Sequence, residues 1–278
     1  MSTSTTIHAS YNIAGKVAVV TGASGVLGSA ACRALAQAGV KVAALGRQES
    51  RLKALIDSIC SAGGDGCVLN ADCLDRAKLE AAALTLKNRF GGVDFLLNFA
   101  GGNRPEATTS PDRAFFTLPK EALDAAIGLN LMGTILPCQV FGQIMAERKQ
   151  GVILNISSMT AARPLTRIVG YSAAKAAVDN FTQWLAVHLA REYSPQIRVN
   201  ALAPGFFLTD QNRYLLTDEK SGQPTERGKS ILQHTPMGRF GTPEDLTGAM
   251  LWLLSPAAAF VTGVVLPIDG GFNAYSGV

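Results

Sequence analysis

The stretch KVAVVTGASGVLG, residues 16–28, decides the fold of this chain. Its first part, Lys16–Thr21, is a short apolar run rich in β-branched residues, which predicts a buried strand. The run Ser29–Ala38 that follows is a good helix former. Three glycines separate the strand from the helix: Gly22, Gly25 and Gly28. Glycines here let the backbone approach a pyrophosphate at the helix N-terminus. Their G-x-x-G-x-x-G spacing differs from the commonest dinucleotide fingerprint, so a plain tight turn is the alternative.

The alternation of strand and helix continues along the chain. The further predicted strands are Val40–Leu45, Cys67–Asn70, Val93–Asn98, Val152–Ile156, Ile197–Ala201 and Val264–Ile268. The further predicted helices are Glu49–Ser61, Asp75–Phe90, Pro119–Leu129, Leu131–Arg148, Tyr171–Glu192 and Pro243–Leu254. Strands separated by helices indicate right-handed βαβ units. We therefore predict an α/β fold, a doubly wound parallel sheet of seven strands in a single domain.

Three polar segments depart from this alternation. We expect residues 1–14 to form a flexible N-terminal arm, followed by a single domain at residues 15–278. The loop Gly101–Leu118 is long enough to indicate a function. The irregular stretch 204–239 is predicted to be the substrate loop and a candidate mobile lid.

Composition indicates a compact globular protein. The 278 residues are 47% apolar and 17% charged, with a net charge of +4 that is too diffuse to indicate nucleic-acid binding. The five cysteines are odd in number and lack metal-ligand spacing, so we expect reduced thiols, no metal site and a cytoplasmic location. The N-terminus does not read as a secretion signal, and no run of 18 apolar residues predicts a membrane span.

The second informative stretch is SMTAARPLTRIVGYSAAK, residues 158–175. Tyr171 and Lys175 are one helical turn apart and share a face. Ser158 follows a predicted strand and can reach the start of that helix. An ammonium favours phenolate by its charge, and a hydroxyl can bind a substrate oxygen, so the three groups can exchange a proton with an alcohol or carbonyl. Such a Tyr–Lys pair also occurs by chance on helices.

Cofactor choice depends on the end of the second strand. No acidic residue is present there to bind the ribose hydroxyls of NAD. Arg47 can instead pair with a 2′-phosphate, which favours NADP. The alternative is an arginine that stacks on adenine or lies in solvent.

These motifs together resemble the short-chain dehydrogenase/reductase family over residues 13 to 272. The resemblance rests on TGASGVLG, Asp72, the NFAG segment Asn98–Gly101, Asn130, Ser158, the Tyr171–Lys175 pair and Pro204-Gly205. It implies a Rossmann-type fold with strand order 3-2-1-4-5-6-7, a nicotinamide cofactor, and a catalytic tetrad of Asn130, Ser158, Tyr171 and Lys175. In that tetrad Tyr171 would transfer the proton and Asn130 would position a water beside Lys175.

The resemblance also assigns cofactor-binding positions. They are Ser24, Gly25 and Leu27 in the phosphate loop, Asp72 at the adenine amino group with Cys73 beside it, Asn98, Ala100 and Gly101 on the adenosine side, and Pro204, Gly205, Phe207 and Thr209 at the carboxamide. Lys175 would also hold the nicotinamide ribose. Phe99 replaces the second Asn of the family motif.

Substrate residues are expected among the cations and amides of the variable loops. They are Arg104, Arg163, Arg167, Gln211, Asn212, Arg213, Tyr214 and His234. They favour a polar, carboxylate-bearing substrate; solvated loop charge is the alternative. NFAGGNRPEATT, AARPLTRIVGYSAAK and PGFFLTDQNRYLL resemble the D-mannonate oxidoreductase (fructuronate reductase) subgroup, which implies a D-fructuronate/D-mannonate substrate and favours NAD, so both cofactors stay open. Gluconate 5-dehydrogenases, 3-oxoacyl reductases and a non-catalytic NAD(P) sensor are the alternatives.

Self-association is the last expectation. Val178, Phe181, Leu185 and Leu189 form an apolar stripe, which Ala177, Trp184, Val187 and His188 extend. The segment 264–278 is apolar for a free sheet edge. Together with the habit of the family, this predicts a homotetramer.

Overall fold

The computed structural model describes residues 9–209, 213–218 and 221–277. Its centre is a seven-stranded, wholly parallel sheet in the order β3-β2-β1-β4-β5-β6-β7. The strands are β1 (Val17–Thr21), β2 (Lys41–Gly46), β3 (Gly66–Asn70), β4 (Phe95–Asn98), β5 (Gly151–Ile156), β6 (Ile197–Pro204) and β7 (Val265–Ile268). This order confirms the Rossmann-type, single-domain α/β fold.

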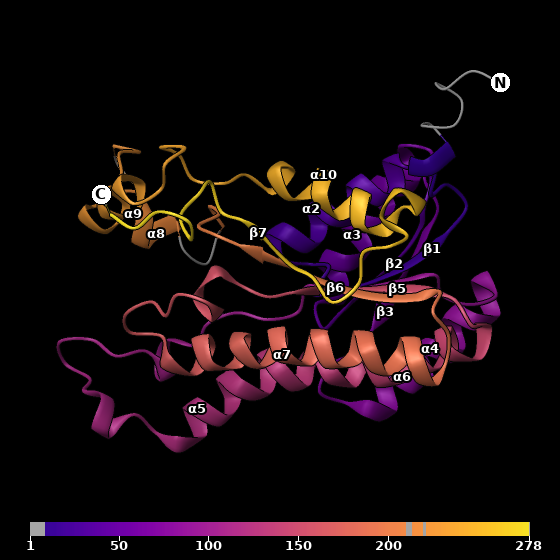
Figure 1. Cartoon of the computed structure of the whole chain (residues 1–278), viewed down its shortest axis with the longest axis horizontal. Helices are drawn as coiled ribbons and strands as arrows, with labels where there is room; N and C mark the ends of the chain where they lie inside the picture. Colours follow the sequence, from indigo (N-terminus) through magenta and orange to yellow (C-terminus); the bar gives the residue numbers. More distant parts are fainter. Residues whose placement is uncertain (1–8, 210–212, 219–220, 278) are drawn as a thin grey trace.

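Two helical layers enclose the sheet (Figure 1). One contains α2 (Val26–Gln37), α3 (Glu49–Ser61) and α10 (Pro243–Leu254); the other contains α4 (Arg76–Phe90), α5 (Lys120–Ile127), α6 (Gly133–Arg148) and α7 (Val169–Glu192). Each layer buries its own hydrophobic core against the sheet. Because both faces are covered, β1 and β6 are buried at every position. Strand β6 also buries Arg198 and Asn200, whose side chains donate to the backbone carbonyls of residues 255 and 261.

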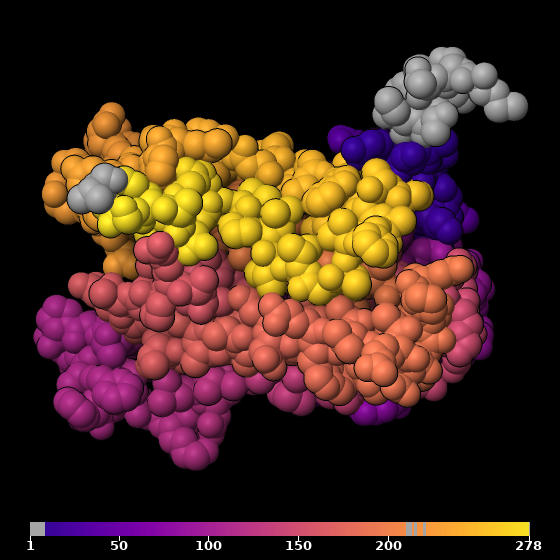
Figure 2. All heavy atoms as spheres, viewed as in Figure 1, coloured from indigo at the N-terminus to yellow at the C-terminus, as the bar shows by residue number. Residues whose placement is uncertain are grey.

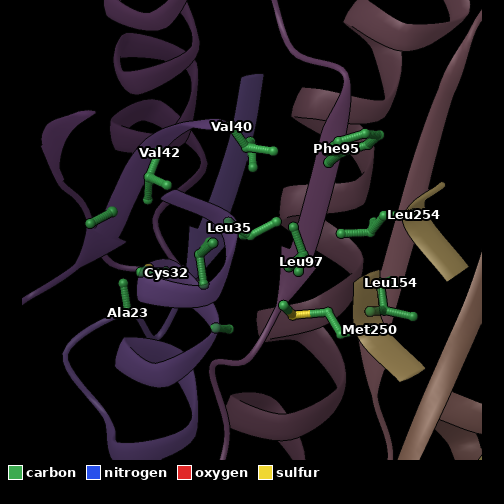
Figure 3. Close-up of a cluster of buried hydrophobic side chains, with 14 of the residues drawn as sticks. Ala23, Cys32, Leu35, Val40, Val42, Phe95, Leu97, Leu154, Met250 and Leu254 are labelled. Atoms are coloured by element: carbon green, nitrogen blue, oxygen red, sulfur yellow. The ribbon is translucent and has the colours of Figure 1, made fainter. Parts of the chain in front are cut away.

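The core beneath α2 and α10 is drawn in Figure 3. Leu35 of α2 and Leu97 of β4 are fully buried, and Met250 and Leu254 of α10 pack in the same cluster. Burying one such side chain contributes about 1.5–3 kcal/mol relative to leaving it exposed. These contacts hold α2 on the sheet, and α2 begins at the predicted phosphate loop.

Several boundaries differ from the sequence prediction. Helix α2 starts at Val26 rather than Ser29, because Gly25 is already its N-cap. Strand β6 runs on to Pro204, where the predicted strand ended at Ala201. The two helices predicted around position 130 are one continuous helical stretch joined by a π-helical turn, Gly128–Met132. The predicted loop 204–239 contains two short helices, α8 (Arg213–Leu216) and α9 (Glu226–Gln233).

The helical stretch Lys120–Arg148 is long and unusually apolar. By length and composition alone it could cross a membrane, with a mean hydropathy of 1.4 in its most apolar window. Half of that window is buried inside the protein, because α6 packs on β4, β5 and α4. The apolar residues of this helix therefore serve the core beneath the sheet.

The predicted N-terminal arm is described only in part. Residues 1–8 lie outside the described residues. Ile13 is 4% exposed and belongs to the core, and Gly15 N–H donates to the Gly39 carbonyl at 2.9 Å. The packed domain therefore includes the end of the segment predicted as an arm.

Candidate active site

The carboxyl ends of four adjacent strands bring the predicted site residues together. In the sheet register Thr21 of β1 lies opposite Asn98 of β4, and Asn98 lies opposite Asn155 of β5. Ser158 follows β5, and Pro204 ends β6. Ligands of open α/β sheets bind at this edge, where the strand order reverses between β1 and β4.

The glycine turn after β1 leaves no room for side chains. Gly22 has a φ of +64°, and a Cβ on it would lie 2.7 Å from the Ala100 nitrogen. A Cβ on Gly28 would overlap the Gly22 carbonyl oxygen. Helix α2 has no side-chain cap and no acidic residue in its first turn, so its N-terminal amides suit a phosphate anion. The turn and helix therefore fit the pyrophosphate of a dinucleotide.

Arg47 and Asp72 form the adenosine side of this edge. The Arg47 guanidinium lies 3.7 Å from the Asp72 carboxylate, with 65% of the Arg47 side chain exposed. Asp72 also accepts the Leu74 N–H at 3.0 Å. The neighbouring Cys73 is buried, and burial raises the pKa of its thiol to about 12. Arg47 can therefore meet a phosphate here, in competition with Asp72.

A buried amide network joins the two central strands to the helices below. The Asn98 side-chain amide donates to Asn155 Oδ1 at 2.9 Å and to Cys138 Sγ at 3.2 Å. Asn155 in turn donates to the Thr182 hydroxyl at 2.9 Å. Asn98 Oδ1 is buried and has no hydrogen-bond partner among the described residues. Asn98 thus holds β4 to β5 at the end of the sheet from which the segment Ala100–Gly101 leaves.

Ser158, Tyr171 and Lys175 form one cluster. The Ser158 hydroxyl hydrogen-bonds the Tyr171 phenol and so opposes the effect of burial, which raises the pKa of that phenol. The Lys175 ammonium lies 5.6 Å from the centre of the Tyr171 ring and donates to the Ile156 carbonyl at 2.6 Å. Lys175 is 3% exposed, and burial lowers its pKa to about 8. This cluster can exchange a proton with a substrate oxygen.

Asn130 lies in the π-helical turn between α5 and α6. Its Oδ1 accepts the Gly102 N–H at 3.0 Å, and its amide donates to the carbonyls of Gly102 and Ala126, each at 2.8 Å. A Cβ on Gly101 would lie 2.8 Å from Asn130 Oδ1 and 3.3 Å from Lys175 Nζ. Asn130 therefore secures the segment after β4 beside Lys175, and π turns frequently mark functional sites.

Sequence reasoning missed Asp179. It lies one turn beyond Lys175 on α7, and its negative charge raises the pKa of Lys175 against the effect of burial. Burial raises the pKa of the Asp179 carboxyl, and the Ser157 hydroxyl and the Lys175 charge oppose that effect. The i, i+4 spacing from Lys175 was a signal in the sequence. Thr21 was also missed: its hydroxyl accepts the Ala100 N–H at 3.1 Å and fixes the NFAG segment.

The loop after β6 presents backbone to the site. Gly205 is tight against Asp269, because a Cβ on it would lie 2.7 Å from the Asp269 Cα. The Phe207 side chain is 4% exposed and packs in the core, so only its backbone can face a cofactor. A cavity of about 390 Å³ lies beside Phe207 and the ends of β6 and β7.

The predicted substrate residues divide into two groups. Arg104 and Arg163 follow β4 and β5, and their loops are joined by the hydrogen bond from Thr109 N–H to the Arg167 carbonyl at 2.9 Å. Arg104 Nε is buried without a partner among the described residues. Arg213 is exposed on α8, and His234 follows α9. Gln211 and Asn212 lie outside the described residues, as does the side chain of Tyr214.

Comparisons with known proteins agree with this geometry. Residues 22–273 match the family profile described as Enoyl-(Acyl carrier protein) reductase. The chain belongs to the short-chain dehydrogenase/reductase family. The Bacillus subtilis protein named uncharacterized oxidoreductase UxuB is 46% identical over 276 residues, which are 96% of this chain and 98% of that protein.

Two solved structures of relatives carry cofactors. A Haemophilus influenza protein described as a candidate D-mannonate oxidoreductase, solved with bound NAD, is 42% identical with a TM-score of 0.90 and covers 98% of this chain and 100% of that one. A Burkholderia cenocepacia gluconate 5-dehydrogenase in complex with NADP and tartrate is 30% identical with a TM-score of 0.86, over 96% of this chain and 98% of that one. This short-chain dehydrogenase/reductase is an NAD(P)-dependent oxidoreductase that acts on a small-molecule alcohol or carbonyl.

Proposed function

We propose that this enzyme interconverts the carbonyl of a keto-hexuronate and the secondary alcohol of an aldonate, with D-fructuronate and D-mannonate as the pair. The observation that carries the chemistry is the cluster in which Ser158 hydrogen-bonds Tyr171 above the buried Lys175. In the reductive direction the ketone gains a hydride and a proton. A nicotinamide held at this edge of the sheet would supply the hydride, and the chain supplies the proton and the orientation.

Each residue of the tetrad has a role that follows from its contacts. Ser158 and Tyr171 bind the carbonyl oxygen, and Tyr171 transfers its phenolic proton to it as the carbon takes the hydride. The Lys175 charge stabilises the resulting phenolate, because an ammonium favours the anion. Asn130 holds Gly101 and Gly102 in place, and its Oδ1 keeps a second lone pair for a water that links Lys175 to solvent.

A carboxylate-bearing substrate is supported by two arginines. Arg104 and Arg163 stand on the two loops that leave β4 and β5 at the site edge, and guanidinium forks match carboxylate geometry. The resemblance to D-mannonate and gluconate enzymes supports the same class. Gln211, Asn212, Arg213 and His234 belong to the proposed substrate loop 204–239. Similarity to a 3-oxoacyl-[acyl-carrier-protein] reductase of Synechocystis, 34% identical over 258 residues, leaves an acyl ketone as the second candidate.

Substrate identity is tested by following reduced-nicotinamide absorbance with uronates, aldonates and acyl ketones, each with NAD(H) and NADP(H). We expect turnover with the sugar acids. Tyr171→Phe keeps the ring but removes the proton donor, so cofactor should still bind while turnover falls about 10²–10⁴-fold. Near-native turnover in Tyr171→Phe would contradict the proton-transfer role of Tyr171. Turnover of acyl ketones but not of sugar acids would contradict the sugar-acid substrate and favour the second candidate.

We also propose a cytoplasmic homotetramer. A groove of about 810 Å³ between α6 and α7 is lined by Phe181, Trp184 and Leu185, and Trp184 is 57% exposed. Strand β7 is an edge of the sheet with incompletely buried side chains. Both surfaces suit two-fold packing against another copy. Light scattering should give a mass near four times the 29.2 kDa chain, and a monomeric mass with full activity would contradict the assembly.

A further inference from the structure

The C-terminal segment Asp269–Tyr275, here called the tail, folds into a tight turn directly after β7. Asp269 accepts the Gly271 N–H at 2.9 Å through one carboxylate oxygen and the Asn273 N–H at 2.8 Å through the other. Gly270 and Gly271 have φ values of +64° and +89°, a backbone conformation that residues with a Cβ atom rarely adopt. The turn thereby fixes the position of Asn273 relative to the sheet edge.

The tail contacts segments that come from three different places in the chain. Phe272 packs edge to face on Phe206 after β6, with ring centres 5.3 Å apart. The Met237 N–H donates to the Gly270 carbonyl at 3.1 Å, and a Cβ on Gly270 would lie 2.9 Å from Thr235 Cγ2. Figure 2 shows the yellow tail seated against the orange α8–α9 region and the rose segment before α7. The tail therefore packs against the segment after β6 and against the end of the proposed substrate loop 204–239.

The contact with the segment before α7 is made by Arg163. Its Nε donates to Asn273 Oδ1 at 3.2 Å. This is the one hydrogen bond from the Arg163 side chain within the described ranges, and no carboxylate among those residues lies within ion-pair distance of it. Arg163 is five residues beyond Ser158, and its N–H donates to the Met159 carbonyl at 3.0 Å. Arg163 is exposed, so the bond to Asn273 occupies one guanidinium nitrogen and leaves the two terminal nitrogens accessible to a ligand.

We propose that Asn273 is a positioning residue for substrate specificity: it orients Arg163 so that the terminal guanidinium nitrogens bind the carboxylate of a sugar acid. A planar guanidinium has five donors in a fixed fork, so a single hydrogen bond at Nε limits its rotation without using the bidentate edge. The pre-oriented fork loses less freedom on binding an acid. This inference rests on the proposed sugar-acid substrate.

The test compares D-mannonate with D-mannitol, which share stereochemistry but differ in the carboxylate. Asn273→Ala should raise the KM for D-mannonate about 10-fold and leave kcat and the cofactor KM nearly unchanged, as expected for loss of uniform substrate binding. Oxidation of D-mannitol should be unaffected. Asn273→Gln keeps a neutral amide acceptor and should recover part of the low KM. Asn88→Ala, an exposed asparagine on α4, is the matched control.

A double-mutant cycle with Arg163→Ala distinguishes positioning from simple damage to the tail. In the Arg163→Ala background, Asn273→Ala should add little, because the residue it orients is gone. Additive losses, or equal losses on D-mannitol, would overturn the role of Asn273. If the wild-type enzyme does not prefer the acid to the polyol, the proposed sugar-acid function is contradicted, and with it the binding of a carboxylate by Arg163. If that preference is present but insensitive to Asn273→Ala, only the inference about Asn273 fails.

Discussion

Replacing Gly28 by Ala tests how the glycine turn holds the cofactor. The added Cβ would overlap the Gly22 carbonyl oxygen and lie 3.0 Å from the Gly22 carbonyl carbon. Gly22 cannot retreat, because its own Cα faces the Ala100 backbone, where a Cβ would be 2.7 Å from nitrogen. Helix α2 must therefore move away from the turn by about 1 Å to restore ordinary contact distances.

The expected magnitudes follow from that movement. Overpacking costs about 1–3 kcal/mol, and the better helix propensity of Ala recovers about 0.5–1 kcal/mol. Because the amides at the start of α2 move with the helix, we expect the Kd for NADH to rise at least tenfold, about 1.4 kcal/mol. Fluorescence titration with NADH and thermal unfolding measure the two effects.

A second glycine supplies the matched control. Gly248 lies within α10, and a Cβ on it would meet nothing within 4 Å. Gly248→Ala should raise the free energy of unfolding by about 0.5–1 kcal/mol and leave the Kd unchanged. If Gly28→Ala behaved in the same way, the close packing of α2 on the turn would not govern cofactor binding, and the reasoning would be refuted.

Three further predictions concern charge and buried polarity. Arg47→Ala should lower kcat/KM for NADPH about tenfold and for NADH far less, because only NADPH has a 2′-phosphate. Equal losses with the two cofactors would exclude pairing of Arg47 with the 2′-phosphate. The rate of carbonyl reduction should decline as the pH rises through about 8, where Lys175 loses its charge. Asp179→Asn should shift this decline to lower pH, because the Asp179 charge raises the pKa of Lys175. An unshifted pH–rate profile would show that Asp179 does not influence the Lys175 charge. Asn155→Ala should cost about 2–4 kcal/mol in urea unfolding, because it leaves buried partners unpaired, and a loss below about 1 kcal/mol would show that the network contributes little.

The Lys175 pKa also links stability to pH. Burial lowers this pKa from 10.5 to about 8, so the folded state binds the proton less tightly than the unfolded chain. The burial of Lys175 therefore costs stability below pH 8, and the cost disappears as the pH rises from 8 towards 10.5. Lys175→Met should remove this dependence, which unfolding measured across that range would detect.

Local chemistry in the sequence predicted the fold and the proximity of Ser158, Tyr171 and Lys175. Parallel strands covered on both faces are mainly apolar, so the seven runs could be recognised from the sequence, and their order followed from the family resemblance. The spacing of Tyr171 and Lys175 required a shared helix face, and the structure places Ser158 against Tyr171. The start of α2 was misplaced because a glycine N-cap carries no side-chain signal.

Contacts between distant segments were decided only by the tertiary structure. The bond between Arg163 and Asn273 spans 110 positions, and the bond between Asn98 and Asn155 spans 57. No periodicity connects residues at such separations, because they meet only when the sheet brings the ends of different strands together. The same holds for the ion pair of Arg47 with Asp72, whose partners follow β2 and β3. The sequence therefore determined which chemical groups the chain possesses, while the packing of its loops decided which of them face one another.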